Sequence, residues 1–269
     1  MENKRLLYVT QEMDPYLALT EMSSVVSKLA PYANDNGWEV RVLMPRFGVI
    51  NERRNRLHEV VRLSGINVII DDYDHPLIIK VASLPGSRIQ VYFLDNEDYF
   101  KRKFVFNDKD DKFFDDNEDR MLFFAKGLME TVKKFGWAPT VIHCHGWMTS
   151  LIPLFLKTQY AKEPILENSK VVYSVYENSF KKKFKKKFLE KVKIGDKVKD
   201  KDIALLEDLD NNALNKIGIK YADAIIQGNE TLENMAEYKK LKSKKPWLDY
   251  QEELNLESNY LEFYNNILS

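Results

Sequence analysis

Short apolar runs and one amphipathic stretch open the chain. Residues 6–10 and 39–45 are mostly apolar runs that predict strands buried on both faces. Between them, residues 20–36 carry apolar side chains at helical spacing, and Gly37 supplies a C-terminal stop. A strand, a helix and a second strand in this order are typical of a parallel sheet in an α/β domain.

The later pattern adds a β-rich region and a helical end. Extended runs without an intervening helix predict an insertion beside the parallel sheet, over residues 58–63, 67–70, 77–84 and 88–94. Further strands are expected over 140–145, 170–176 and 223–227, and helices over about 116–135 and 148–157. After Gly228 the chain is expected to be helical, with one face of a terminal helix formed by Trp247, Tyr250, Leu254, Leu261 and Tyr264. The pattern predicts a single α/β domain over residues 1–269, in which a Rossmann-like parallel sheet is flanked by helices.

Composition narrows the class of protein. Hydrophobic residues make up 44% of the 269 positions, and 41 basic residues balance 41 acidic ones, so the composition is not that of a disordered chain. One cysteine, Cys144, excludes a disulfide scaffold. The longest apolar run, residues 151–156, is far shorter than the roughly 20 residues of a membrane span, and the first residues lack a secretory signal. We expect a cytoplasmic protein that binds neither membrane nor nucleic acid.

Six short motifs, in order along the chain, carry a family resemblance. They lie at residues 10–15, 37–48, 92–102, 117–120, 143–148 and 214–223. Together they make residues 4–235 similar to the N-terminal half of bacterial glycogen and starch synthases, glycosyltransferase family 5. The resemblance implies one half of a GT-B fold. It also implies transfer of glucose from ADP-glucose or UDP-glucose to an α-1,4-glucan, with no metal or other cofactor.

The donor loop departs from the family pattern. Where the family has Lys-Thr-Gly-Gly, Ala18 replaces the lysine, and Thr20 and Glu21 replace the two glycines. Glycines there let backbone N–H groups approach a phosphate at a helix N-terminus, and a glutamate repels it. The resemblance therefore predicts a degenerate donor loop over these three positions.

The cleft motifs are altered as well. Gly146 replaces the acid of the family's His-Asp-Trp-His, and Tyr176 replaces the histidine of its Thr-x-His-Asn. Glu12 and His145 remain at matched cleft positions, and Trp147 and Tyr176 are aromatic side chains suited to sugar rings. We take these four as candidate sugar-binding residues. The alternatives are a helix cap for Glu12, a buried hydrogen-bonded role for His145, and packing at the sheet edge for the two aromatic residues.

The same region carries neither a metal site nor an identified catalytic residue. His143, Cys144 and His145 are consecutive, so on a strand their side chains point to opposite faces, and the sequence holds no second ligand cluster. No catalytic residue is assigned, because four substituted positions fall in one pocket and this length leaves no room for the family's nucleotide-sugar domain.

The expected function is that of a glycogen or starch synthase-like protein of α-glucan metabolism, inactive on its own, that binds a glucan or a partner protein. One alternative is an active glucosyltransferase completed by a partner chain, and the former interdomain face is a plausible homodimer surface. Residues 260–268 resemble the family's closing helix, so the tail, 236–269, is expected to pack back on the domain.

A second alternative is an interaction protein acting through a basic helix over residues 181–188. Phe180, Phe184 and Phe188 recur every four residues with lysines between them, which is typical of a cationic amphipathic helix. The favoured interpretation is a surface helix with its phenylalanines in the core and its lysines in water. The acidic run at 108–118 could offset this charge, in a neighbouring copy.

Overall fold

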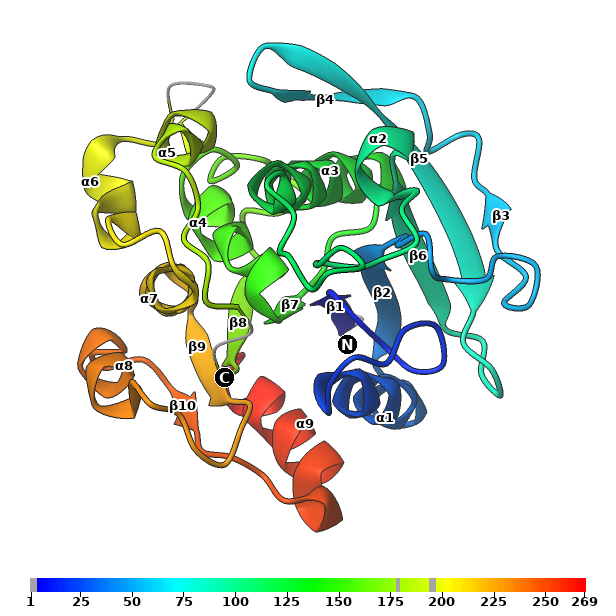
Figure 1. The fold of residues 1–269 in the computed structure, drawn as a ribbon. Helices are drawn as coiled ribbons and strands as arrows, with labels where there is room; N and C mark the ends of the chain where they lie inside the picture. The colour runs from blue at the N-terminus through cyan, green and yellow to red at the C-terminus, as the bar shows by residue number, and fades with distance from the viewer. Residues whose placement is uncertain (1–3, 178–179, 194–196) are drawn as a thin grey trace.

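Parallel strands form the centre of the sheet (Figure 1). The computed structural model describes residues 4–177, 180–193 and 197–269, and within them a ten-stranded sheet has the order β10-β9-β8-β7-β1-β2-β6-β5-β3, with β4 paired to β5. The parallel strands are β10 (Trp247–Leu248), β9 (Ala224–Gln227), β8 (Lys170–Val175), β7 (Val141–His145), β1 (Arg5–Thr10), β2 (Glu39–Pro45) and β6 (Gln90–Asp95). Almost every residue of the central strands is buried. The parallel pairing of these strands confirms the predicted Rossmann-like sheet.

Antiparallel strands extend one edge of this sheet. They are β3 (His58–Glu59), β4 (Ile66–Ile70) and β5 (Tyr73–Ser83), and β5 pairs antiparallel with β6. The prediction that the run at 88–94 belongs to the insertion is wrong, since β6 pairs parallel with β2. Five of its six residues are buried, which marks a strand covered on both faces.

Helices cover both faces of the sheet. On one face α1 (Met22–Asp35) and α9 (Leu256–Asn266) lie side by side, and on the other lie α3 (Asn117–Phe135), α4 (Leu151–Lys157) and α7 (Asn211–Tyr221) (Figure 1). The remaining short helices are α2 (Glu97–Phe100), η1 (Trp147–Thr149), α5 (Lys187–Val192), α6 (Asp200–Ile203), η2 (Ala204–Leu206), α8 (Met235–Leu241) and η3 (Glu253–Asn255). None of the helices in the described ranges is both long and apolar enough to cross a membrane.

The basic segment does not form the predicted helix. Residues 181–185 are irregular, and α5 begins only at Lys187. The three phenylalanines are nevertheless buried, and the rings of Phe180 and Phe184 stack with centroids 5.3 Å apart. Tertiary packing of these rings, rather than helical periodicity, determines the path of the backbone here.

Acidic groups of the same chain pair with several lysines in and beside this segment. Lys182 pairs with Asp115, and Lys191 Nζ lies 2.6 Å from Asp119 Oδ1. The Lys185 backbone N–H donates to Glu118 over 2.8 Å. The offset by the acidic run thus takes place within one chain. The interaction alternative loses its predicted helix, and part of the positive charge of the segment is paired internally.

The C-terminal segment also differs from the prediction. Trp247 lies in β10, and Leu254 is 88% exposed, because the helix begins only at Leu256. Tyr264, on α9, is wholly buried, and its hydroxyl lies 2.7 Å from His143 Nδ1 in the sheet. The face that the terminal helix turns to the domain therefore consists of fewer residues than the spacing of apolar residues in the sequence predicts.

Candidate functional site

A pocket opens at the carboxyl ends of the parallel strands. Its volume is about 700 Å³, and it lies where the strand order reverses between β1 and β7, the usual ligand position in such sheets. Five parts of the chain line it: the end of β1, the start of α1, the loop before α3, the turn after β8 and the turn after β9. The lining residues are Gln11, Leu19, Thr20, Glu21, Met22, Phe104, Val105, Phe106, Asn107, Asp108, Asp111, Tyr176, Glu177 and Asn229.

Acidic side chains dominate the charge of this pocket, which we call the acidic pocket. Glu21, Asp108, Asp111 and Glu177 line it, and none of the described lining residues is a lysine, an arginine or a histidine. Hydrogen bonds from the Lys112 and Asp110 backbone N–H groups lower the pKa of Asp108, so this carboxylate stays charged. Like charges repel, so the lining disfavours a diphosphate.

The loop at 104–111 forms one wall of the acidic pocket. Its turn closes through the Asp108 backbone N–H, which donates to the Lys112 carbonyl over 2.8 Å, and Phe106 packs on Trp147 with ring centroids 5.1 Å apart. Phe104 remains 44% exposed beside the pocket. Apolar residues flank the acids of this stretch, which is a signal in the sequence that the loop is anchored.

Arg120 holds the same wall from behind. Its Nη1 donates over 2.6 Å both to the Val105 carbonyl and to Asn117 Oδ1, and its guanidinium lies 5.2 Å from the centre of the Phe47 ring. Burial lowers the pKa of Arg120 to about 9. A wholly buried arginine thus fixes the carbonyl beside Phe104, so the wall is built by the core.

Glu12 lies beneath the acidic pocket and binds the donor loop. Its Oε2 accepts hydrogen bonds from the backbone N–H groups of Leu19, at 2.6 Å, and Thr20, at 2.9 Å, and its Oε1 accepts one from the Thr20 hydroxyl. The N–H of Met22 donates to Thr20 Oγ1 over 3.3 Å. Burial raises the pKa of the Glu12 carboxyl group. The amides that could bind an external anion are therefore engaged inside the protein.

The three donor-loop positions differ in whether they line the acidic pocket. Thr20 and Glu21 line it, while Ala18 is exposed and does not. Glu21 precedes α1 and makes no side-chain capping bond. A carboxylate therefore stands at the helix N-terminus, where a phosphate would otherwise bind.

His145 and Tyr176 belong to a buried hydrogen-bond network. His145 Nδ1 lies 2.8 Å from the Tyr176 hydroxyl, and His145 Nε2 lies 3.1 Å from His143 Nδ1. His143 Nε2 in turn lies 2.8 Å from Ser174 Oγ. Burial lowers the pKa of His145 to about 3 and that of His143 well below 6.5, so both rings are neutral. Tyr176 closes over His145, which does not reach the acidic pocket.

Trp147 lies in an aromatic cluster rather than at the pocket surface. It is 3% exposed, and the rings of Phe106, Phe113, Phe180 and Phe184 lie within 6.1 Å of its own. Of the four candidate sugar-binding residues, only Tyr176 lines the pocket. In the described residues, no group of three or more His, Cys, Asp or Glu side chains is placed to hold a metal ion.

Comparison with known proteins identifies the family. The family model of the starch synthase catalytic domain matches residues 5–241, most of the chain. This chain belongs to the starch synthase catalytic domain family. It is 36% identical to the glycogen synthase of Chlorobaculum tepidum over 229 residues, which cover 83% of this chain and 45% of that protein. It is 40% identical to the glycogen synthase of Chlorobium chlorochromatii over 178 residues, or 65% and 36% of the two chains. The chain thus spans less than half the length of these relatives.

A solved structure of a starch synthase has the same fold. The catalytic domain of starch synthase IV from Arabidopsis thaliana, bound to ADP and acarbose, superposes with a TM-score of 0.74. The match covers 92% of this chain and 51% of that one, at 15% sequence identity. The fold is therefore one half of the GT-B arrangement of starch synthases.

Gly146 of this starch synthase family member lies against the Gln11 side chain. It occupies the position of the acid in the family pattern, with φ 85° and ψ 163°. A Cβ atom there would lie 2.5 Å from Gln11 Oε1, which also accepts a hydrogen bond from the Met148 backbone N–H over 3.3 Å. Gln11 has taken the space that a side chain at position 146 would need.

Proposed function

We propose that this starch synthase family member acts in α-glucan metabolism as a non-catalytic protein that binds a neutral α-glucan in the acidic pocket. One observation carries the proposal. The pocket at the carboxyl edge of the sheet is lined by four carboxylates, and no cation is found among its described lining residues.

We infer that the site does not use a nucleotide sugar as a glucosyl donor. Glucosyl transfer from a nucleotide requires stabilisation of the charge that develops on the leaving diphosphate. Here Ala18 brings no cation, Glu21 brings a negative charge, and the Glu12 carboxylate already binds the loop amides. Each of these features opposes a bound diphosphate, and they act at the same end of α1.

We also infer that the site accepts an oligosaccharide. Carboxylates accept hydrogen bonds from sugar hydroxyls, and side-chain amides both accept and donate them. The pocket offers Asn107 and Asn229 besides its acids. Phe104 exposes a ring that can cover the apolar face of a glucose unit. The volume of about 700 Å³ suits a short oligosaccharide. The starch synthase IV structure holds acarbose as well as ADP, and we assign only the oligosaccharide role to the present chain.

We propose that the tail, residues 236–269, belongs to the same domain as the rest of the chain. Three contacts support this: the pairing of β10 with β9, an ion pair between Lys28 and Glu253, and the contact between Tyr264 and His143. Residues of this tail also pack beside the start of α1, next to Glu21.

Phe104→Ala is expected to weaken the binding of maltoheptaose about tenfold. A ring that covers about 50 Å² of sugar, at about 25 cal/mol per Å², contributes about 1.3 kcal/mol, close to a tenfold change in affinity. The measurement is calorimetric titration at constant buffer composition. Tyr73→Ala is the matched control, because Tyr73 is an aromatic residue with 71% exposure that does not line the pocket. Equal affinities for wild type and Phe104→Ala would count against this site, as would turnover of ADP-glucose by the chain, alone or with a partner chain.

A further inference from the structure

A second pocket, which we call the arginine pocket, lies between the segment after β2 and the turn between β5 and β6. Its volume is about 590 Å³, and it shares no lining residue with the acidic pocket. The lining residues are Tyr16, Arg54, Asn55, Arg56, His58, Ser83, Leu84, Pro85, Gly86 and Ser87.

The charge of the arginine pocket is opposite to that of the acidic pocket. Arg54, Arg56 and His58 line it, and its described lining includes no aspartate or glutamate. The three side chains are exposed and form no ion pair within the described part of the chain. The charge of the two guanidinium groups is therefore free to attract an anion.

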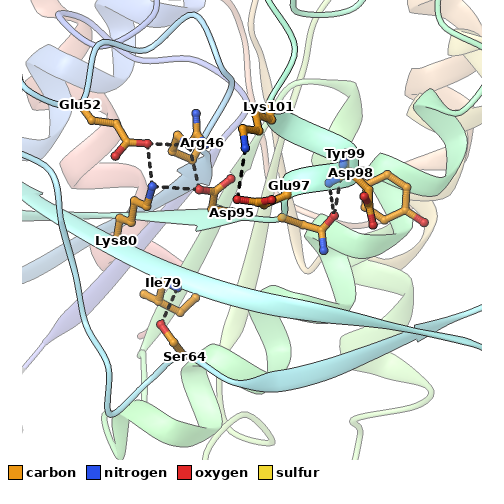
Figure 2. Close-up of polar contacts among 11 residues, drawn as sticks. Arg46, Glu52, Ser64, Ile79, Lys80, Asp95, Glu97, Asp98, Tyr99 and Lys101 are labelled. Carbon is orange, nitrogen blue, oxygen red and sulfur yellow. Dashed lines mark hydrogen bonds and ion pairs between the residues drawn. The ribbon is translucent and has the colours of Figure 1, made fainter.

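Neighbouring carboxylates are already engaged (Figure 2). Glu52, two residues before Arg54, lies with its Oε1 2.6 Å from Lys80 Nζ and 3.3 Å from Arg46 Nε. Asp95 Oδ2 lies 2.9 Å from the same Arg46 Nε and 3.1 Å from Lys80 Nζ. This four-residue cluster balances its own charges, so it leaves the arginines of the adjacent turn without a counter-ion.

The turn that carries the arginines is fixed by its own hydrogen bonds. The Arg54 backbone N–H donates to Asn51 Oδ1 over 2.8 Å, and the Leu57 N–H donates to the Glu52 carbonyl over 2.9 Å. Arg56 has φ 54°, in the left-handed region of backbone conformation. On the opposite wall, the Tyr16 hydroxyl donates to the Ser83 carbonyl over 3.0 Å. Hydrogen bonds to the backbone thus hold both walls of the arginine pocket in place.

We propose that the arginine pocket binds a sugar phosphate, that is, a phosphate monoester of a small polyhydroxylated molecule. Guanidinium groups bind phosphate oxygens through paired, charge-assisted hydrogen bonds. Asn55, whose Nδ2 donates to the Asn51 carbonyl, has its amide oxygen left to accept a hydrogen bond from a hydroxyl, and the volume is in the range of small-molecule sites. This site is independent of glucan binding in the acidic pocket.

Calorimetric titration with glucose 6-phosphate tests the proposal, with inorganic phosphate and glucose as comparison ligands at constant ionic strength. We expect glucose 6-phosphate to bind, inorganic phosphate to bind more weakly, and glucose not to bind. Arg54→Gln and Arg56→Gln are each expected to lower the affinity at least about tenfold, since a hydrogen bond to a charged group contributes on this scale.

Arg53→Gln is the matched control, because Arg53 is an exposed arginine of the same turn that does not line the pocket. It is expected to retain wild-type affinity. No binding of glucose 6-phosphate would overturn the proposal, and so would an equal loss in all three variants, which would indicate diffuse attraction. Inorganic phosphate binding as tightly as the ester would overturn the assignment to a sugar phosphate.

Discussion

Lowering the pH from 7.5 to 5 is expected to reduce the free energy of unfolding by about 4 kcal/mol through two histidines alone. His143 and His145 are wholly buried, with ring centroids 3.8 Å apart. With both rings neutral, the Tyr264 hydroxyl can donate to His143 Nδ1 over 2.7 Å, and His143 Nε2–H can donate to Ser174. A second proton on either ring would place a positive charge in the core with no carboxylate in this network.

The sign of the effect follows from where the protons bind. In the unfolded chain a histidine takes up a proton below a pH of about 6.5. In the folded chain burial lowers the pKa of His145 to about 3 and moves that of His143 in the same direction. Between these values the unfolded state binds more protons, so stability is lost as the pH falls.

Urea unfolding at the two pH values measures this loss. Burial raises the pKa of Glu12 and Glu118, which opposes the effect, so the difference between wild type and His145→Gln isolates one histidine. The variant is expected to lose about 2 kcal/mol less than wild type over the same range. Ring resonances of the two buried histidines that titrate near pH 6.5 in the folded protein would refute this account.

Gly146→Asp, which restores the acid of the family pattern, is expected to destabilise the protein by about 3 kcal/mol or more. The backbone at Gly146, with φ 85° and ψ 163°, lies in a region adopted almost only by glycine. The new Cβ would also meet Gln11 Oε1 at 2.5 Å, so the Gln11 side chain would have to move and give up the hydrogen bond that it accepts from the Met148 backbone N–H. Strain and collision therefore add at this position.

Gly86→Asp separates the two contributions. Gly86 has φ 76°, but a Cβ there meets nothing within 4 Å, so this variant carries backbone strain without the collision. Chemical denaturation of both variants is expected to show the larger loss for Gly146→Asp, with partial recovery in the double variant Gln11→Ser/Gly146→Asp. Equal losses for the two single variants would show that Gln11 does not block the position.

Most of the sheet is predictable because its central strands are short apolar runs. β1 and β7 are buried along almost their whole length, so local composition alone marks them as strands. The family motifs add the topology, since they preserve order and spacing. β6 illustrates the limit of this reasoning: its sequence indicates a strand, but its parallel partner depends on how β2 and β5 come together.

The acidic pocket is less predictable because distant residues build it. The wall that carries Phe104 depends on Arg120 and on Trp147, which follow it by many residues. The same cause explains the failed helix at 181–188. A four-residue spacing of phenylalanines fits a helix, yet Phe180 and Phe184 pack on Trp147 and Phe113 instead. A local pattern contains no information about such partners.

We expect the acidic pocket to bind a neutral glucan and to exclude a nucleotide sugar. The most direct test of this expectation is calorimetric titration of one preparation of the protein, first with maltoheptaose and then with ADP-glucose. We predict saturable binding of maltoheptaose and no binding of ADP-glucose, because four carboxylates line the site and none of its described lining residues is a cation. Binding of ADP-glucose in the micromolar range, or the absence of any binding of maltoheptaose, would contradict it.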